Sequence, residues 1–122
     1  MVLITIKLDK KTGLGTLTRS GITYNCGGKP GFPYPPDTTL SQDYFVKKPL
    51  HESGEYVQRN KDGTTSPFPM KWSVLWIGQR GVWIHEMAQL PGSSGCIHLL
   101  PGDAKAFYDA VQPGDRIVFS WT

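Results

Sequence analysis

Residues 72–99 read WSVLWIGQRGVWIHEMAQLPGSSGCIHL. Two runs rich in β-branched and aromatic residues, 72–77 and 82–85, flank the turn residues of 78–81, and this pattern predicts a β-hairpin. The next ten residues end in Pro-Gly-Ser-Ser-Gly, which predicts a loop. The short apolar segment 96–100 then predicts another strand.

Strand patterns continue on both sides of this stretch. The expected elements are strands at 2–8, 15–19, 22–25, 43–47, 56–60 and 116–121, a Pro- and Gly-rich loop at 27–37, and one helix at about 104–111. Asp103 is the expected N-cap of that helix, and Pro113-Gly114 is its expected stop. Seven or eight strands with no crossover helices predict a mostly β fold, a sandwich or barrel of short strands with one main helix.

Composition agrees with this fold class. Glycine and proline make up 24 of the 122 residues, a fifth of the chain, against a usual share of roughly 12%. The length predicts one domain over residues 1–122. The net charge of +3 comes without any run of Lys or Arg longer than two, so we expect no nucleic-acid partner.

We also expect no membrane span, because no apolar run reaches about 18 residues. Residues 1–8 are apolar but lack a basic n-region, a long apolar h-region and a cleavage site, so no signal peptide is expected.

The candidate chemistry lies in His85 and in the segment around Cys96. A thiol attacks as the thiolate, and a nearby imidazole can take its proton. Gly95 has no side chain, so its backbone can approach a substrate closely, and the Cys96 amide can then face a developing oxyanion.

Three other interpretations of these residues stay open. Cys96 could be a small packed hydrophobic residue, as free cysteines often are. Cys96, His85 and His98 could together bind zinc, although the usual paired ligand spacing is absent. Cys26 and Cys96 could form a disulfide, which would remove the nucleophile.

Three segments carry a resemblance to a known family: GVWIH at 81–85, SSGCIHL at 93–99 and GDRIVF at 114–119. Together with MKWSVLWIG at 70–78, they resemble the YkuD-type L,D-transpeptidase catalytic domain. That family places a histidine after a strand, then Ser/Thr-His-Gly-Cys, a hydrophobic residue, and Arg or Asn. A helix and a closing strand follow.

The resemblance implies a thiol mechanism without a metal or organic cofactor. Cys96 would attack the carbonyl of the L-centre of meso-diaminopimelate in a peptidoglycan tetrapeptide stem, releasing D-Ala and leaving a thioester. His85 would be the general base, and the amides of Gly95 and Cys96 would hold the oxyanion. A backbone carbonyl, at Glu86 or Ser94, would orient His85.

Water, a free D-amino acid or a stem amine would then resolve the thioester. Ser94 belongs to the expected oxyanion turn. Ser93, His98 and Trp83 are the expected substrate-binding residues.

Two departures from the family pattern bear on the biological setting. Ser94 stands where the family usually has a second histidine, and His98 stands where Arg or Asn is usual. With the short interval between His85 and Cys96 and no signal peptide, the chain resembles compact effectors delivered by type VI secretion. The implied setting is a bacterial protein that acts in the periplasm or cell wall, is exported by a specialised system and has an immunity protein as partner.

Two alternatives remain at this point. One is a housekeeping L,D-transpeptidase domain. The other is a non-catalytic cell-wall binding module whose aromatic side chains stack on sugars, although aromatic residues on strands usually pack in the core. The aromatic residues concerned are Tyr34, Tyr44, Tyr56, Trp72, Trp76, Trp83 and Trp121.

Overall fold

The computed structural model describes residues 2–122, except for the side chains of residues 54–56. The strands are β1 (Leu3–Leu8), β2 (Leu14–Arg19), β3 (Ile22–Gly27), β4 (Asp37–Thr39), β5 (Lys47–Arg59), β6 (Thr65–Ile77), β7 (Val82–Glu86), β8 (Ile97–Leu99) and β9 (Arg116–Trp121). The helical elements of the described part are one α-helix, α1 (Asp103–Ala110), and the short 3-10 helix η1 (Gly78–Arg80).

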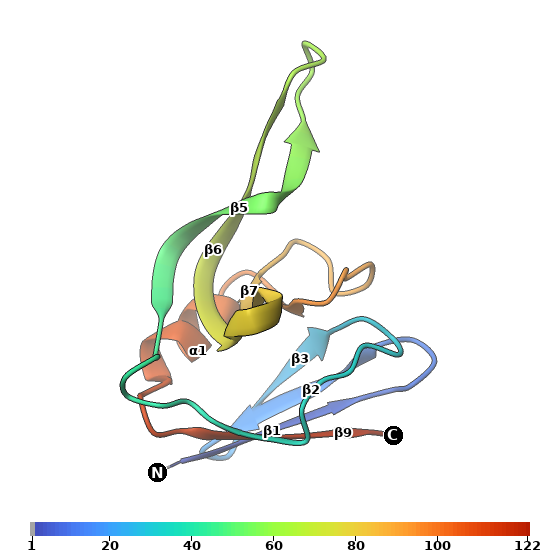
Figure 1. The fold of residues 1–122 in the computed structure, drawn as a ribbon. Coiled ribbons are helices and arrows are strands. Elements are labelled where there is room, and N and C mark those ends of the chain that lie inside the picture. Colours follow the sequence, from blue (N-terminus) through green and yellow to red (C-terminus); the bar gives the residue numbers. More distant parts are fainter. Residues whose placement is uncertain (1) are drawn as a thin grey trace.

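All nine strands belong to one sheet with the order β4-β9-β1-β2-β3-β8-β7-β6-β5. Figure 1 shows that this sheet curls, so that β1, β2, β3 and β9 form one layer and the β5–β6 hairpin rises away from it as a long arm. Helix α1 packs against β6, β7 and β8. The predicted fold class, mostly β with one main helix, is confirmed.

The main core lies between the layer of β1, β2, β3 and β9 and the layer of β6, β7 and β8. The alternation read in residues 2–8 is confirmed, because Ile4, Ile6 and Leu8 are all fully buried. Their neighbours on the opposite face of β1 stay partly or fully exposed. One side of the strand therefore supplies core, as a period of two requires.

The turn between β2 and β3 also matches its sequence signal. Ser20 and Gly21 have φ angles of 49° and 77°, and a two-residue turn with two positive φ angles fits the twist of a hairpin. The strand predicted at 116–121 is β9, and the loop predicted after β3 is present up to β4.

The strand predicted at 43–47 is wrong. Residues 42–44 form a turn, closed by a bond from the Tyr44 amide to the Ser41 carbonyl at 3.0 Å. Tyr44 is 81% exposed, and only Phe45 and Val46 of this segment pack, partly buried, against the two apolar clusters. Strand β5 begins only at Lys47, and β4 was not predicted.

The predicted cap of the helix is also wrong by one residue. Gly102 is the N-cap, with φ of 90° and no side-chain bond, and Asp103 is the first helical residue. The Ala104 amide donates to the Leu100 carbonyl at 3.0 Å, and the Ala106 amide donates to the Gly102 carbonyl at 3.0 Å. Because the preceding turn already accepts an early amide, the helix does not need a side-chain cap.

Most of the aromatic side chains pack inside the protein. Tyr34 stacks on Trp76 with ring centroids 5.3 Å apart and also contacts Phe119 and Trp121. Trp83 is 8% exposed. The Tyr56 side chain lies outside the described residues. This packing favours a core role for these rings over an exposed sugar-stacking platform.

Within the described part of the chain, no helix has the length and apolar character needed to span a membrane.

Candidate active site

Strands β7 and β8 position the candidate residues. The two strands run parallel, with Ile84 opposite Ile97 and His85 opposite His98. Since successive side chains of a strand point to opposite faces, Ile84 and Ile97 enter the main core. Trp83, His85, Cys96 and His98 fall on the other face. Trp83 and Cys96 there join a second, smaller apolar cluster with Met70.

A cavity of about 230 Å³ opens on that face. It is lined by Val57, Phe68, Met70, His85, Met87, Gly92, Ser94, Cys96 and His98. The structure therefore brings together four of the residues singled out from the sequence: His85, Ser94, Cys96 and His98.

The Cys96 thiol is held against the start of β7. Its Sγ atom accepts from the Trp83 amide at 3.4 Å, and the thiol donates to the Gly81 carbonyl at 3.7 Å. Only 6% of Cys96 is exposed. The bond from the Trp83 amide stabilises the thiolate, whereas the bond to the Gly81 carbonyl stabilises the protonated thiol.

Cys26 lies in a different environment. It is fully buried in the main core, and burial raises the pKa of its thiol to about 12. Both cysteines lie within the described residues, and they are not joined by a disulfide. Cys26 therefore stays protonated at neutral pH and has no access to the cavity face of the sheet.

His85 is oriented by a backbone carbonyl. Its Nδ1 atom lies 2.9 Å from the Glu86 carbonyl oxygen, and a carbonyl can only accept, so Nδ1 carries the proton. The Nε2 atom then has the free lone pair that a general base needs. Of the two orienting groups left open by the sequence, the structure has the Glu86 carbonyl in this position.

Burial keeps the His85 ring neutral. The side chain is 1% exposed, and this burial is the main reason that the pKa of His85 falls to about 4. Positive charge on His98 or His51 would lower the pKa further, whereas the bond to the Glu86 carbonyl raises it. At neutral pH the ring is uncharged, with its single proton on Nδ1 and with Nε2 able to accept a second.

His98 is a second buried imidazole at the cavity. Its Nδ1 atom lies 3.1 Å from the Leu90 carbonyl oxygen, so its Nε2 atom is also the acceptor. The rings of His85 and His98 meet edge to face with centroids 5.2 Å apart. Burial lowers the pKa of His98 as well.

The turn before Cys96 is fixed by hydrogen bonds. The Gly95 amide donates to Ser93 Oγ at 3.0 Å, and the Ser93 hydroxyl donates to the Cys96 carbonyl. Gly95 has a φ of 145°, and a Cβ there would lie 2.9 Å from the Phe32 ring, so this position requires glycine. The Gly95 amide, expected at the oxyanion, is used inside the turn.

A model of the L,D-transpeptidase catalytic domain family named YkuD matches residues 10–119. The chain belongs to the YkuD family.

Solved structures show the same fold. An L,D-transpeptidase from Mycobacterium smegmatis is 24% identical with a TM-score of 0.65, over 98% of this chain and 58% of that chain. L,D-transpeptidase 1 from Mycobacterium tuberculosis is 23% identical with a TM-score of 0.62, over 99% of this chain and 62% of that chain. An L,D-transpeptidase from Stackebrandtia nassauensis is 20% identical with a TM-score of 0.67, over 98% of this chain and 55% of that chain.

This chain thus spans less than two thirds of the length of each of these similar structures. No curated protein matched the sequence.

Two predicted substrate-binding residues of this YkuD chain lie beside the cavity rather than among its lining residues. Ser93 is bonded within the turn. The Trp83 ring stacks on His51 with centroids 4.2 Å apart. Their observed contacts support the walls of the cavity.

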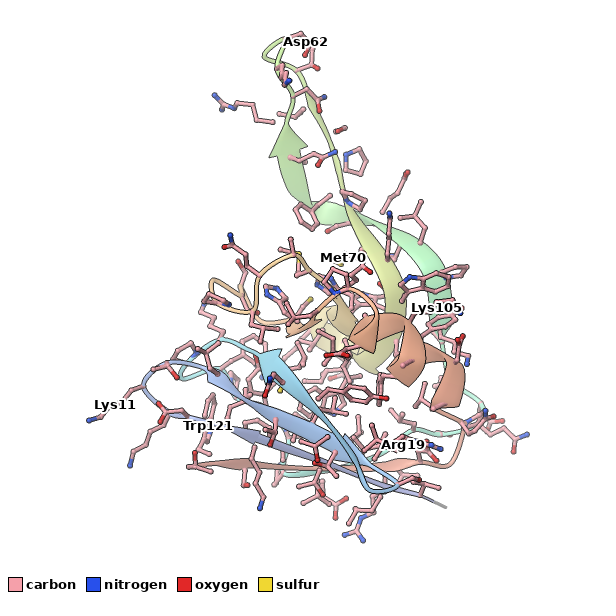
Figure 2. All side chains as sticks on the ribbon, turned by 180° about the vertical axis from the view of Figure 1, so that it is seen from behind. Lys11, Arg19, Asp62, Met70, Lys105 and Trp121 are labelled. Carbon is pink, nitrogen blue, oxygen red and sulfur yellow. The ribbon has the colours of Figure 1, made fainter. Side chains whose placement is uncertain are left out.

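The arm contributes lining residues that the sequence analysis missed: Val57, Phe68 and Met70. Strand β6 bends below them, where Trp72 has a φ of 52° and Ser73 Oγ donates to the Met70 carbonyl at 2.7 Å. Figure 2 labels Met70 where the arm meets the body and Asp62 at the tip of the arm. The sequence analysis predicted a strand only from residue 72, whereas β6 begins at Thr65, so it did not anticipate this bend.

The zinc interpretation receives no geometric support. Among the residues that the structure describes, no three His, Cys, Asp or Glu side chains are arranged to hold a metal ion.

Proposed function

We propose that this YkuD domain is a cysteine-dependent enzyme that acts on peptidoglycan tetrapeptide stems. The observation that carries the proposal is that Cys96 and a neutral, carbonyl-oriented His85 line one cavity. A nucleophile, a base and a group that orients the base are the parts that thiol acyl transfer requires.

The first half of the reaction forms a thioester. Cys96 Sγ attacks the carbonyl carbon at the L-centre of meso-diaminopimelate while His85 Nε2 takes the thiol proton. The Cys96 amide donates to the oxyanion of the tetrahedral intermediate. Collapse breaks the C–N bond, and His85 returns the proton to the amine of the departing D-Ala.

The second half regenerates the thiol. A stem amine, a free D-amino acid or water attacks the thioester carbon, and His85 takes a proton from the attacking group. Sulfur leaves and recovers its proton. The three acceptors give cross-linking, D-amino-acid exchange and L,D-carboxypeptidation.

The cavity suits the reacting end of an extended substrate. Its volume of about 230 Å³ is below the range of roughly 300–1,000 Å³ for sites that enclose a drug-sized ligand. The rest of the stem would therefore lie along the arm, beside Val57 and Phe68. His98 Nε2 would accept a hydrogen bond from a substrate N–H, while Ser93 and Trp83 hold the walls.

We further propose that the chain is an antibacterial effector, exported by a specialised secretion system and restrained by an immunity protein. The short interval between His85 and Cys96 supports this setting over a housekeeping transpeptidase, as do Ser94 and His98 at two positions of the motif. Directing the chain to the periplasm of a test bacterium should arrest growth, and Cys96→Ala should restore it. Equal growth with both proteins would favour the housekeeping role.

The activity itself is tested by mass spectrometry of purified muropeptides incubated with the protein or with Cys96→Ala, with and without D-methionine. We expect Cys96-dependent loss of D-Ala from tetrapeptides. Tripeptides, D-methionine adducts or cross-linked dimers identify the acceptor. Unchanged muropeptides with folded protein would refute the substrate assignment.

A further inference from the structure

The proline-rich loop between β3 and β4 places one tyrosine behind the nucleophile. Tyr34 is 6% exposed, and its hydroxyl lies 2.6 Å from the Gly95 carbonyl oxygen and 2.9 Å from the Lys29 amide nitrogen. Gly95 directly precedes Cys96, so this hydroxyl bonds to the peptide group whose nitrogen belongs to the nucleophile.

The direction of both hydrogen bonds follows from their partners. The Lys29 amide can only donate, so the Tyr34 oxygen accepts from it. The Gly95 carbonyl can only accept, so the Tyr34 hydroxyl donates its proton there. Burial raises the pKa of Tyr34 to about 12, so the hydroxyl keeps that proton at neutral pH.

The ring that carries this hydroxyl is immobilised. Tyr34 stacks on Trp76 with an interplanar angle of 3° and packs against Phe32 with centroids 4.7 Å apart. Phe32 in turn lies directly against Gly95. The loop thus holds the Gly95–Cys96 peptide in two places: Phe32 packs against the α-carbon of Gly95, and Tyr34 bonds to the Gly95 carbonyl oxygen.

We propose that Tyr34 is a positioning residue that fixes the Gly95–Cys96 peptide plane so that the Cys96 amide is directed at the oxyanion. This inference rests on the thiol acyl transfer proposed above. The peptide is trans, so its N–H points opposite to its C=O. Tyr34 belongs to the main core and holds the carbonyl toward it, so the N–H points away from that core.

This role would not extend to every reaction of the thiol. Acyl transfer passes through a tetrahedral oxyanion and needs the oriented amide. Alkylation by iodoacetamide is a direct displacement at carbon and forms no oxyanion. A positioning residue for the oxyanion therefore affects the first reaction and spares the second, whereas a general structural defect affects both.

The test compares the two reactions in Tyr34→Phe, which removes the hydroxyl and keeps the ring. We expect acylation of Cys96 by p-nitrophenyl acetate to slow about tenfold or more, since loss of a whole oxyanion donor costs roughly 100- to 1,000-fold. Alkylation by iodoacetamide should stay within about twofold.

Thr38→Val is the matched control, because it removes the 3.2 Å bond from Trp76 Nε1 to Thr38 Oγ1 beside the same aromatic stack. Both reactions should then keep their wild-type rates. Unchanged acylation in Tyr34→Phe, or an equal loss in both reactions, would overturn the inference. A wild-type Cys96 that p-nitrophenyl acetate does not acylate would overturn it together with the proposed thiol chemistry.

Muropeptides that stay unchanged, while the acetate test separates the two reactions, would refute the substrate assignment and leave the role of Tyr34 standing. If Tyr34→Phe does not fold, 3,5-difluorotyrosine at position 34 replaces it. The hydroxyl of this residue is more acidic and should lose its proton at a lower pH than in the wild type. The rate of Cys96 acylation should therefore also fall at a lower pH. An unshifted pH profile of acylation would contradict the inference.

Discussion

The two faces of the β7–β8 pair differ sharply although they alternate along the same few residues. Ile84 and Ile97 point into the main core and are fully buried among apolar side chains. His85 and Cys96 point the other way, into a cavity that the β5–β6 arm lines in part. One face supplies packing, and the other carries all the candidate chemistry.

The comparison teaches that neighbouring residues here should have opposite mutational effects. A substitution on the core face should lower the free energy of unfolding and leave the chemistry of the folded fraction intact. A substitution on the cavity face should remove the chemistry and leave the fold. The predictions below test that separation.

The largest effect on stability is expected for Ile97→Ala. Truncating a fully buried isoleucine removes apolar contacts and leaves a cavity, at a cost of about 2–5 kcal/mol in the free energy of unfolding. Cys96→Ala should cost less, because it removes one sulfur atom from the smaller apolar cluster and one weak hydrogen bond from the Trp83 amide. Urea denaturation of both variants measures the difference. Similar losses in both would mean that the two faces are not separate.

The next largest effect is expected in the pH dependence of the free energy of unfolding, and it arises from histidines on the cavity face. A histidine with a pKa of about 4 in the folded protein and about 6.5 in the unfolded chain binds more protons when unfolded between those values. Stability then rises with pH across this window and is lost as the pH falls from about 6.5 to about 4.

His85 alone would account for a loss of roughly 3 kcal/mol at about 1.4 kcal/mol per pKa unit. His98 and His51 also have lowered pKa values and act in the same direction. His85→Gln should therefore flatten the profile in part, so that stability falls less than in the wild type between pH 6.5 and pH 4. Thermal unfolding over that range measures it, and a slope equal to the wild type would show that His85 is not buried as a neutral ring.

The sequence predicts the core face better than the cavity face. Ile4, Ile6 and Leu8 alternate within a single strand, so their burial follows from a local pattern. The strand predicted at 43–47 is wrong because residues 42–44 form a turn in which Tyr44 is exposed. The predicted N-cap of the helix was wrong because the Leu100 carbonyl accepts a hydrogen bond from the Ala104 amide in the first turn. The sequence does not reveal such backbone bonds.

The candidate site divides in the same way. His85 lies on β7, His98 lies on β8, and Cys96 directly precedes β8, so their meeting at the cavity follows from nearby sequence. Tyr34 reaches Gly95 from 61 residues away, and Met70 reaches the cavity through a bend in β6. These contacts depend on how the curled sheet closes, which no local pattern encodes.

The smallest effect on stability is expected on the arm, which belongs to neither packed face. Val57 is 60% exposed yet lines the cavity, so Val57→Ser should change the free energy of unfolding by no more than about 0.5 kcal/mol. If the substrate lies along the arm, loss of this apolar contact should raise KM a few-fold and leave kcat unchanged, because it removes binding common to the ground and transition states.

Gln58→Ser is the control for this prediction, since its side chain lies on the opposite face of β5 and bonds to Ser66 Oγ at 3.2 Å. Steady-state kinetics with purified tetrapeptides should separate the two variants. A KM that stays at the wild-type value in Val57→Ser would mean that the arm covers the cavity without binding the stem. The chemistry would then depend on the β7–β8 face alone.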